Sequence, residues 1–243
     1  MKKLFVVYSI VFAASCFADN SPMLVSVKLD RAFIPVGFDD NDNVQVTVSG
    51  VLPSNCYKIG PVKAEVDGAT RTVKVNQTAY YYSGFCIPMV VPFVQTVSVG
   101  LVRDGDYNVI DKASQKTLGK IPISRSTTTN ADDFLYAPIN DVIVSKVENE
   151  QMMCLQGTFT DRCTKLKEVR VLYQPVVIVV QPIATRVGGR CGLELSRFQY
   201  CQPLNSSLTG TFLIHVRVMN GQAINKLVDL GDTIDPIVVT RND

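Results

Sequence analysis

The sequence predicts an all-β protein built from two tandem immunoglobulin-like β-sandwich domains that arose by internal duplication. Three observations lead to this prediction. Short segments in which apolar and polar residues alternate recur along the chain, matched landmark residues recur about 105 positions apart, and no apolar stripe of helical spacing extends over a useful length. Together they predict many short strands in two similar units.

Alternation of period two defines the strands of the first unit. Val44, Val46 and Val48 alternate with polar residues, for example. Strands are expected near Pro35 and at 44–50, 61–67, 70–76, 93–99, 105–111 and 117–123. In the second unit Phe212 to Val218 alternates, and Asn220-Gly221 then predicts a type I′ hairpin turn. About seven strands per hundred residues are typical of an immunoglobulin-like sandwich.

The duplication is read from six pairs of positions that occur in the same order in both units. The first two pairs are 107 residues apart and the other four are 105 apart, so one two-residue deletion aligns them. The pairs are Gly50 and Gly157, Cys56 and Cys163, Cys86 and Cys191, Phe93 and Phe198, Gly105 and Gly210, and Tyr107 and Phe212. Units of about 100 residues each follow from this alignment.

The domain boundaries follow from composition. Residues 1–18 form a secretory signal, residues 19–123 form unit one, and residues 134–243 form unit two. Between the units, the stretch 124–133 is polar and lacks alternation, which is typical of a linker.

The N-terminal segment predicts export. Two lysines precede a largely apolar run from Leu4 to Ala14 that is too short to span a bilayer. We favour cleavage after Ala18. The alternative is an imperfect lipobox that ends at Cys16, in which case Cys16 carries a lipid. Either route leads to the periplasm, the outer membrane surface or secretion.

Six cysteines remain once Cys16 is removed or lipidated, and an even number in an exported chain predicts disulfides. Six cysteines can pair in 15 ways, and the repeat reduces this number to one. It pairs Cys56 with Cys86 and Cys163 with Cys191, at the same landmarks of the two units. Cys154 and Cys201 remain, and they align with Thr47 and Thr96 on strands that are neighbours in a sandwich. A cross-strand disulfide between their outward-facing side chains is therefore expected.

Charge and hydropathy exclude several classes of function. Without the signal the chain has 22 basic and 22 acidic residues, so no basic stripe for nucleic acid is expected. No later segment is apolar for long enough to predict a transmembrane span.

The sequence offers little for catalysis. His215 is the only histidine, and we expect it to be a solvated residue on the outward face of a strand. The segment from Asp39 to Asn43 carries five oxygen-bearing side chains; we interpret it as a solvated turn, with calcium binding as the alternative. No metal site, cofactor or catalytic residue is predicted.

Three consecutive aromatic residues, Tyr80, Tyr81 and Tyr82, are the remaining candidates. Burial of one face of the run is the favoured interpretation, and contact with a binding partner is the alternative. The sequence therefore predicts a non-catalytic envelope or secreted protein that serves as a structural or protein-binding module, with a protein of the cell envelope as its partner. The alternative is a carbohydrate- or peptidoglycan-binding module that uses these aromatic residues.

Overall fold

The computed structural model describes residues 21–231 except 131, 149 and 190. The predicted signal and the predicted lipid acceptor Cys16 lie outside these residues. Within the described part the chain forms strands and no helix, so it has no helix that could cross a membrane. The strands of the first unit are β1 (Met23–Val27), β2 (Arg31–Phe33), β3 (Phe38–Asp39), β4 (Val44–Ser54), β5 (Tyr57–Asp67), β6 (Thr72–Tyr81), β7 (Pro88–Gly100), β8 (Gly105–Asp111) and β9 (Thr117–Ser124). Those of the second unit are β10 (Ile139–Val147), β11 (Glu150–Asp161), β12 (Thr164–Tyr173), β13 (Val177–Arg186), β14 (Leu193–Pro203), β15 (Gly210–Val218) and β16 (Gln222–Leu230).

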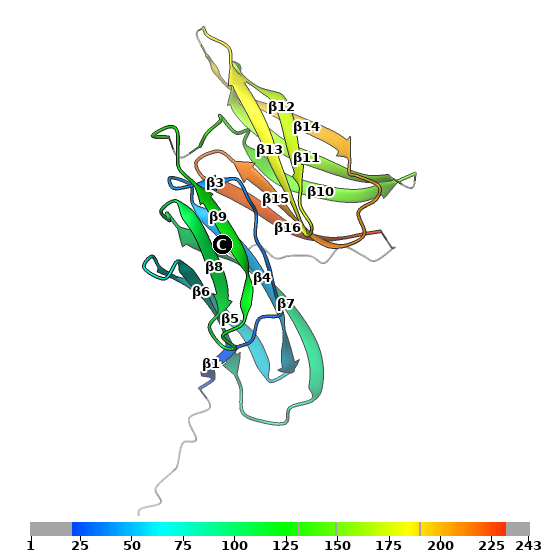
Figure 1. Ribbon diagram of the computed structural model, residues 1–243. Helices are drawn as coiled ribbons and strands as arrows, with labels where there is room; N and C mark the ends of the chain where they lie inside the picture. Colours follow the sequence, from blue (N-terminus) through cyan, green and yellow to red (C-terminus); the bar gives the residue numbers. More distant parts are fainter. Residues whose placement is uncertain (1–20, 131, 149, 190, 232–243) are drawn as a thin grey trace, which may run out of the picture.

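Each unit is a β-sandwich, and the two follow one another along the molecule, with unit one in the lower part of Figure 1 and unit two in the upper part. In unit one the sheet β2-β4-β7 packs against a sheet that contains β5, β6, β8 and β9 in this order. In unit two β10-β11-β14 packs against β12-β13-β15-β16. β1 and β3 are additional strands of unit one, paired with β6 and β9; the order of the other seven strands is the same in both units, so the tandem sandwich fold and its duplication are as predicted.

The strand order differs from that of an immunoglobulin domain in one respect. There the fourth strand joins the sheet of the first two. Here the corresponding strands, β6 and β13, lie in the opposite sheet and run parallel to β8 and β15. A parallel pair requires a crossover, and β7 and β14 supply it by passing through the other sheet.

Alternation on β4 and β11 fills the two cores. Val44, Val46 and Val48 have no exposed surface, and neither do Met153 and Leu155. Both strands extend beyond the residues that alternate between core and surface, because β-pairing continues into polar and exposed residues at both ends.

The paired glycines and phenylalanines of the repeat have a packing reason. Gly50 lies opposite Phe93 on the neighbouring strand, and Gly157 lies opposite Phe198. In both units the phenyl ring covers the glycine: a Cβ built on Gly157 would lie 2.5 Å from Cζ of Phe198 and 2.2 Å from the carbonyl oxygen of Pro138. Only glycine fits beneath the ring.

Three disulfides are present, and they join the pairs expected from the repeat. Cys56–Cys86 and Cys163–Cys191 connect equivalent loops, with Cα–Cα distances of 5.4 and 5.5 Å. Cys154–Cys201 joins directly opposed residues of β11 and β14. At the equivalent register of unit one, the hydroxyl oxygens of Thr47 and Thr96 lie 2.8 Å apart in a hydrogen bond. The disulfides indicate an oxidising environment.

The two units share a small apolar cluster. Phe33 of β2 packs against residues of β13, β15 and β16, among them Val179, Leu213 and Leu227. Both faces of β13 and β15 are therefore buried, one in the core of unit two and the other against unit one. Uninterrupted apolar runs such as Val177–Val180 are typical of strands that are buried on both faces.

Candidate functional site

The prediction that His215 is solvated is wrong, because the outward face of β15 is covered by unit one. Its side chain is 1% exposed, packs edge-on against Phe38 and is hydrogen-bonded through Nδ1 to Asn225 Oδ1 at 2.7 Å. Asn225 in turn donates to Gln45 Oε1 across the junction. Burial lowers the pKa of His215 to about 4, so the ring is neutral at pH 7 and has no free path to a substrate.

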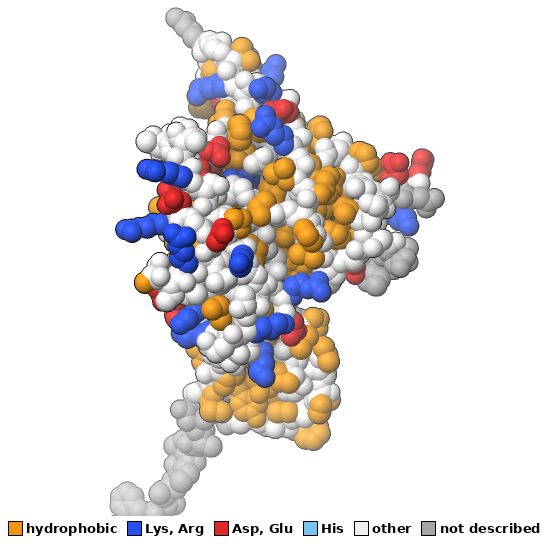
Figure 2. Space-filling model, in the orientation of Figure 1, with side chains coloured by type: hydrophobic (Ala, Val, Ile, Leu, Met, Phe, Trp, Pro, Cys, Tyr) orange, Lys and Arg blue, Asp and Glu red, His pale blue; other side chains and the backbone are white. Residues whose placement is uncertain are grey.

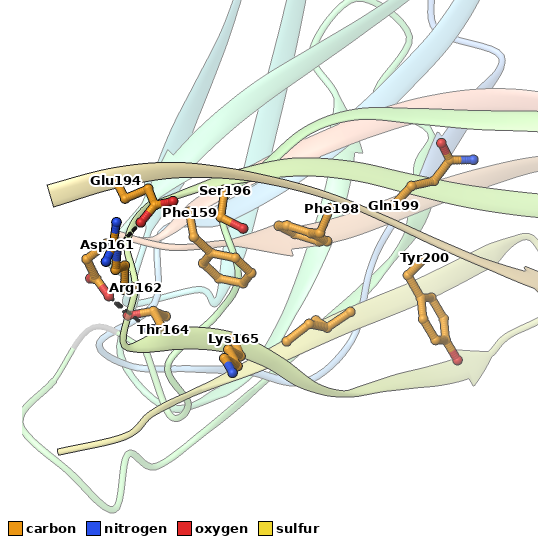
Figure 3. A pocket seen from close by; sticks show the side chains of 11 residues that line it. Phe159, Asp161, Arg162, Thr164, Lys165, Glu194, Ser196, Phe198, Gln199 and Tyr200 are labelled. Carbon is orange, nitrogen blue, oxygen red and sulfur yellow. Dashed lines mark hydrogen bonds and ion pairs between the residues drawn. The ribbon is translucent and has the colours of Figure 1, made fainter. Parts of the chain in front are cut away.

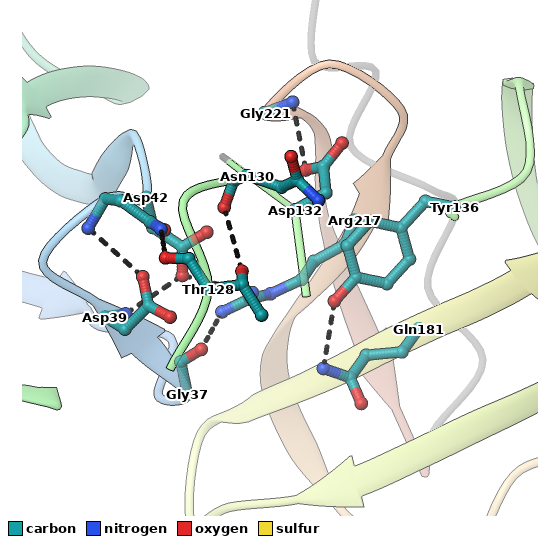
Figure 4. A network of polar contacts seen from close by, with 11 residues as sticks. Gly37, Asp39, Asp42, Thr128, Asn130, Asp132, Tyr136, Gln181, Arg217 and Gly221 are labelled. Carbon is teal, nitrogen blue, oxygen red and sulfur yellow. Dashed lines mark hydrogen bonds and ion pairs between the residues drawn. The ribbon is translucent and has the colours of Figure 1, made fainter. Parts of the chain in front are cut away.

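The prediction that the turn from Asp39 to Asn43 is solvated is also wrong. Asp39 and Asp42 are buried, and Asp42 accepts a hydrogen bond from the amide of Asp39 and forms an ion pair with Arg217 of β15 at 3.3 Å (Figure 4). Burial raises the pKa of Asp42, and the Arg217 guanidinium offsets part of that rise. The turn is thus a structural contact of the junction, and its buried oxygens are engaged within the protein.

Arg217 is the centre of this junction network. Its guanidinium lies 5.0 Å from the ring centre of Phe38 and donates to the carbonyl oxygen of Gly37. Its Nε is buried and has no hydrogen-bond partner among the described residues. Arg217 of unit two thus contacts Gly37, Phe38 and Asp42 of unit one.

The predicted linker is tied to both units. The amide of Ser126 donates to the carboxylate of Asp40 in unit one. The carboxylate of Asp132 accepts from the amides of Asn220 and Gly221, at the tip of the predicted hairpin turn. Both turn residues have φ of 65°, as a type I′ turn requires.

One cluster of potential metal ligands brings together Asp161, Cys163 and Cys191, with ligand atoms within 4.8 Å of one another. The two sulfur atoms are bonded to each other in a disulfide and are not thiolates. Asp161 accepts hydrogen bonds from the amides of Cys163 and Thr164. The cluster is a cap on the loop, and it offers no set of ligands for a metal.

The three tyrosines lie at the end of β6 and just beyond it. Tyr80 and Tyr82 are 38% and 37% exposed, and Tyr81 packs against Tyr57 with ring centres 5.1 Å apart. Tyr81 is half-buried on the same side of β6 as the buried Ala79, and Tyr80 and Tyr82 lie on the exposed side, so the expected burial of one face forms in part. Contact of these residues with a partner remains a prediction.

A groove opens in unit two along the edge formed by β12 and β14 (Figure 3). At the equivalent edge of unit one β5 approaches β7 closely, whereas the described parts of β12 and β14 do not approach each other in this way. The groove has a volume of about 440 Å³. Its apolar floor is formed by Phe159, Leu166, Phe198 and Tyr200, with Phe159 stacked on Phe198 at 4.6 Å.

Charged residues line one end of this groove. Arg162 and Glu194 form an exposed ion pair there, and Lys165 lies on the opposite strand. Such a groove suits a peptide: the apolar floor can accept apolar side chains, and the polar rim can contact the polar backbone.

The outer strand of the groove is an exposed edge. Among the described strands β14 is hydrogen-bonded only to β11, which leaves its other edge without a strand partner. On its outward face Leu193 and Leu195 are 94% and 75% exposed. An edge strand that carries apolar side chains is a template for pairing with another chain.

The sequence interpretation did not identify this site. A signal was present, because Leu193, Leu195 and Arg197 alternate with Glu194, Ser196 and Phe198. Alternation predicts the strand and its faces, but it does not tell that β12 would fail to cover the inner face.

Comparisons with known proteins support the fold. A family model described as the ORF11 beta-sandwich domain matches residues 46–115, which extend from β4 to just beyond β8 in unit one. No curated protein and no solved structure is similar enough to the chain to count as a match.

Proposed function

We propose that this protein is an exported, non-catalytic module of the cell envelope or the secreted fraction, and that it binds a protein partner along the β12/β14 edge of unit two. The observation on which the proposal rests is the open edge of β14, which has no strand partner on that side among the described residues. β14 combines this edge with exposed Leu193 and Leu195 and an adjoining groove with a stacked aromatic floor. A partner strand could add to β14 and place alternate side chains in the groove.

Two further features support a binding role over catalysis. The single histidine is buried and hydrogen-bonded within the junction, and the six described cysteines are disulfide-bonded. Hydrogen bonds from Arg217 join unit two to Asp42 and Gly37 of unit one, and a joined pair of units suits a protein that presents a surface.

Site-specific photocrosslinking tests the proposal. A photoreactive residue at position 195 should capture a defined protein from the envelope fraction, and the substitution Leu193→Lys should reduce the yield. The matched control is position 101, since Leu101 is 72% exposed and directly follows β7 in unit one.

Equal labelling at positions 195 and 101 would contradict binding at this edge. Retention on purified peptidoglycan or on a glycan array that is lost when Tyr80 and Tyr82 are replaced by Ser would favour the carbohydrate-binding alternative.

A further inference from the structure

The end of unit one farthest from unit two exposes a group of apolar side chains, which we call the apolar tip. It consists of Met23, Tyr82, Phe85, Ile87, Met89 and Val90. Phe85 is 91% exposed and Val90 is 73% exposed. On the face drawn in Figure 2 the lower end of the molecule shows apolar and uncharged side chains, while the charged side chains gather higher up.

The apolar tip is held in place by the surrounding structure. Cys56–Cys86 anchors the loop next to Phe85, and Asn55 exchanges hydrogen bonds with Ile87, its side-chain oxygen accepting from the amide at 2.8 Å. The amide of Tyr82 donates to the carbonyl oxygen of Cys56. These contacts hold the loop on both sides of Phe85, whose side chain is exposed.

The charge around the tip favours a lipid surface. The three segments that meet at this end of unit one, 21–25, 51–59 and 78–92, contain no Asp or Glu. Lys58 lies 5.1 Å from the ring centre of Tyr82, and Tyr80 is half-exposed beside it. Tyrosine and lysine around an apolar centre are the residues that settle at the boundary between headgroups and acyl chains, and no carboxylate opposes contact with anionic lipid.

The path of the chain leads to the same end. β1 begins at Met23, which lies opposite Tyr81, so the described chain starts beside the apolar tip (Figure 1). The predicted lipid acceptor Cys16 precedes Ser21 by five residues, which span at most about 17 Å. A lipid at Cys16 would therefore bring the apolar tip to the bilayer, where the lipid and the tip would add to the anchoring.

We propose that the apolar tip of unit one docks on the surface of a lipid bilayer. Phe85, Ile87 and Val90 enter the interfacial layer, and the tyrosines with Lys58 lie at the headgroups. This orientation directs unit two away from the membrane and leaves its open edge accessible. The lipid contact is separate from the proposed protein binding, and either can fail without the other.

The absence of tryptophan from the sequence gives a direct test. The substitution Phe85→Trp introduces a single fluorophore at the tip, in the chain that begins at Asp19 and carries no lipid. With vesicles of phosphatidylethanolamine and phosphatidylglycerol, its emission should shift to shorter wavelength and be quenched by acyl chains that carry a nitroxide. Leu101→Trp, also highly solvent-accessible but remote from the tip, should show neither change.

Flotation with the same vesicles gives a second readout. The double substitution Phe85→Asp/Val90→Asp should lower partitioning at least tenfold, roughly the contribution of one buried apolar side chain. Leu193→Asp/Leu195→Asp on unit two is the matched control and should float as the unchanged protein does. Both pairs are exposed, so folding and disulfides should be retained.

The proposal is overturned if the unchanged protein does not float, if the emission of the Phe85→Trp variant does not shift, or if the tip variant floats equally well. Crosslinking from position 85 to an envelope protein, together with no vesicle binding, would assign the tip to a protein partner instead. Crosslinking from position 195 reports on unit two and does not depend on any of these outcomes.

Discussion

The contribution of the Cys154–Cys201 disulfide to the free energy of unfolding can be measured by substitution. The replacement residues are those that unit one has at the equivalent positions. The double substitution Cys154→Thr/Cys201→Thr copies the Thr47–Thr96 hydrogen bond, which lies at the equivalent register. Both positions face outward on neighbouring strands, so the exchange leaves the core of unit two unchanged. Removing both cysteines also avoids a free thiol that could attack the other disulfides.

The expected loss follows from the loop that the bond closes. The two cysteines are 47 residues apart, and the chain-entropy relation gives a stabilisation of about 4 kcal/mol for a loop of this length. A cross-strand threonine pair restores about 0.2–1 kcal/mol. The variant should therefore lose about 3 kcal/mol of the free energy of unfolding.

The assay is urea unfolding, in which the m-value should stay unchanged, together with calorimetry. Tm should fall by roughly 12–24 °C if unit two unfolds alone and by roughly 6–12 °C if both units unfold together, because the shift per kcal/mol is smaller for a larger cooperative unit. Peptide mapping must show that Cys56–Cys86 and Cys163–Cys191 are intact. A loss below about 1 kcal/mol under those conditions would refute the loop-entropy reasoning.

Three further outcomes are expected in unfolding measurements. Gly157→Ala places a methyl group 2.2 Å from a backbone oxygen and should cost about 1–3 kcal/mol, whereas Gly68→Ala, with nothing within 4 Å, should change stability by less than about 0.5 kcal/mol. The pKa of His215 is about 4 in the folded protein and 6.5 in the unfolded chain, so its contribution to the free energy of unfolding is complete above pH 6.5 and is lost as pH falls towards 4. The difference in stability between the unchanged protein and His215→Gln should therefore shrink by about 3 kcal/mol over that window. A difference that stays constant with pH would contradict the burial argument. Arg217→Met leaves Asp42 buried without its partner and should cost about 3–5 kcal/mol, most of it regained in Arg217→Met/Asp42→Leu; no recovery would mean that the contacts of Arg217 with Phe38 and Gly37 dominate.

Local pattern and internal comparison were sufficient for much of the architecture. Alternation fixes which side of β4 faces the core, since the side chains of a strand have a period of two, and Val44, Val46 and Val48 are buried as expected. The repeat supplied the long-range information that a single sequence usually lacks. Matching Cys154 to Thr47 and Cys201 to Thr96 placed both cysteines on adjacent strands, and the structure joins them.

Only the tertiary structure decided what covers each face. Alternation at β15 indicates an outward face for His215 and Arg217, but it cannot tell whether that face meets water or a second unit. Docking of unit one removes water from this face, so burial lowers the pKa of His215 and Asp42 becomes the partner of Arg217.

The open edge of unit two and the apolar tip of unit one were also beyond the sequence. Leu193 and Phe85 resemble core residues in the sequence, and they are exposed because none of the described strands covers them. A strand pattern specifies the faces of one element, whereas exposure depends on the distance between elements far apart in the chain. For this reason the sequence predicted the two sandwiches and their disulfides, and the packing of elements far apart in the chain determined which surfaces remain free to bind.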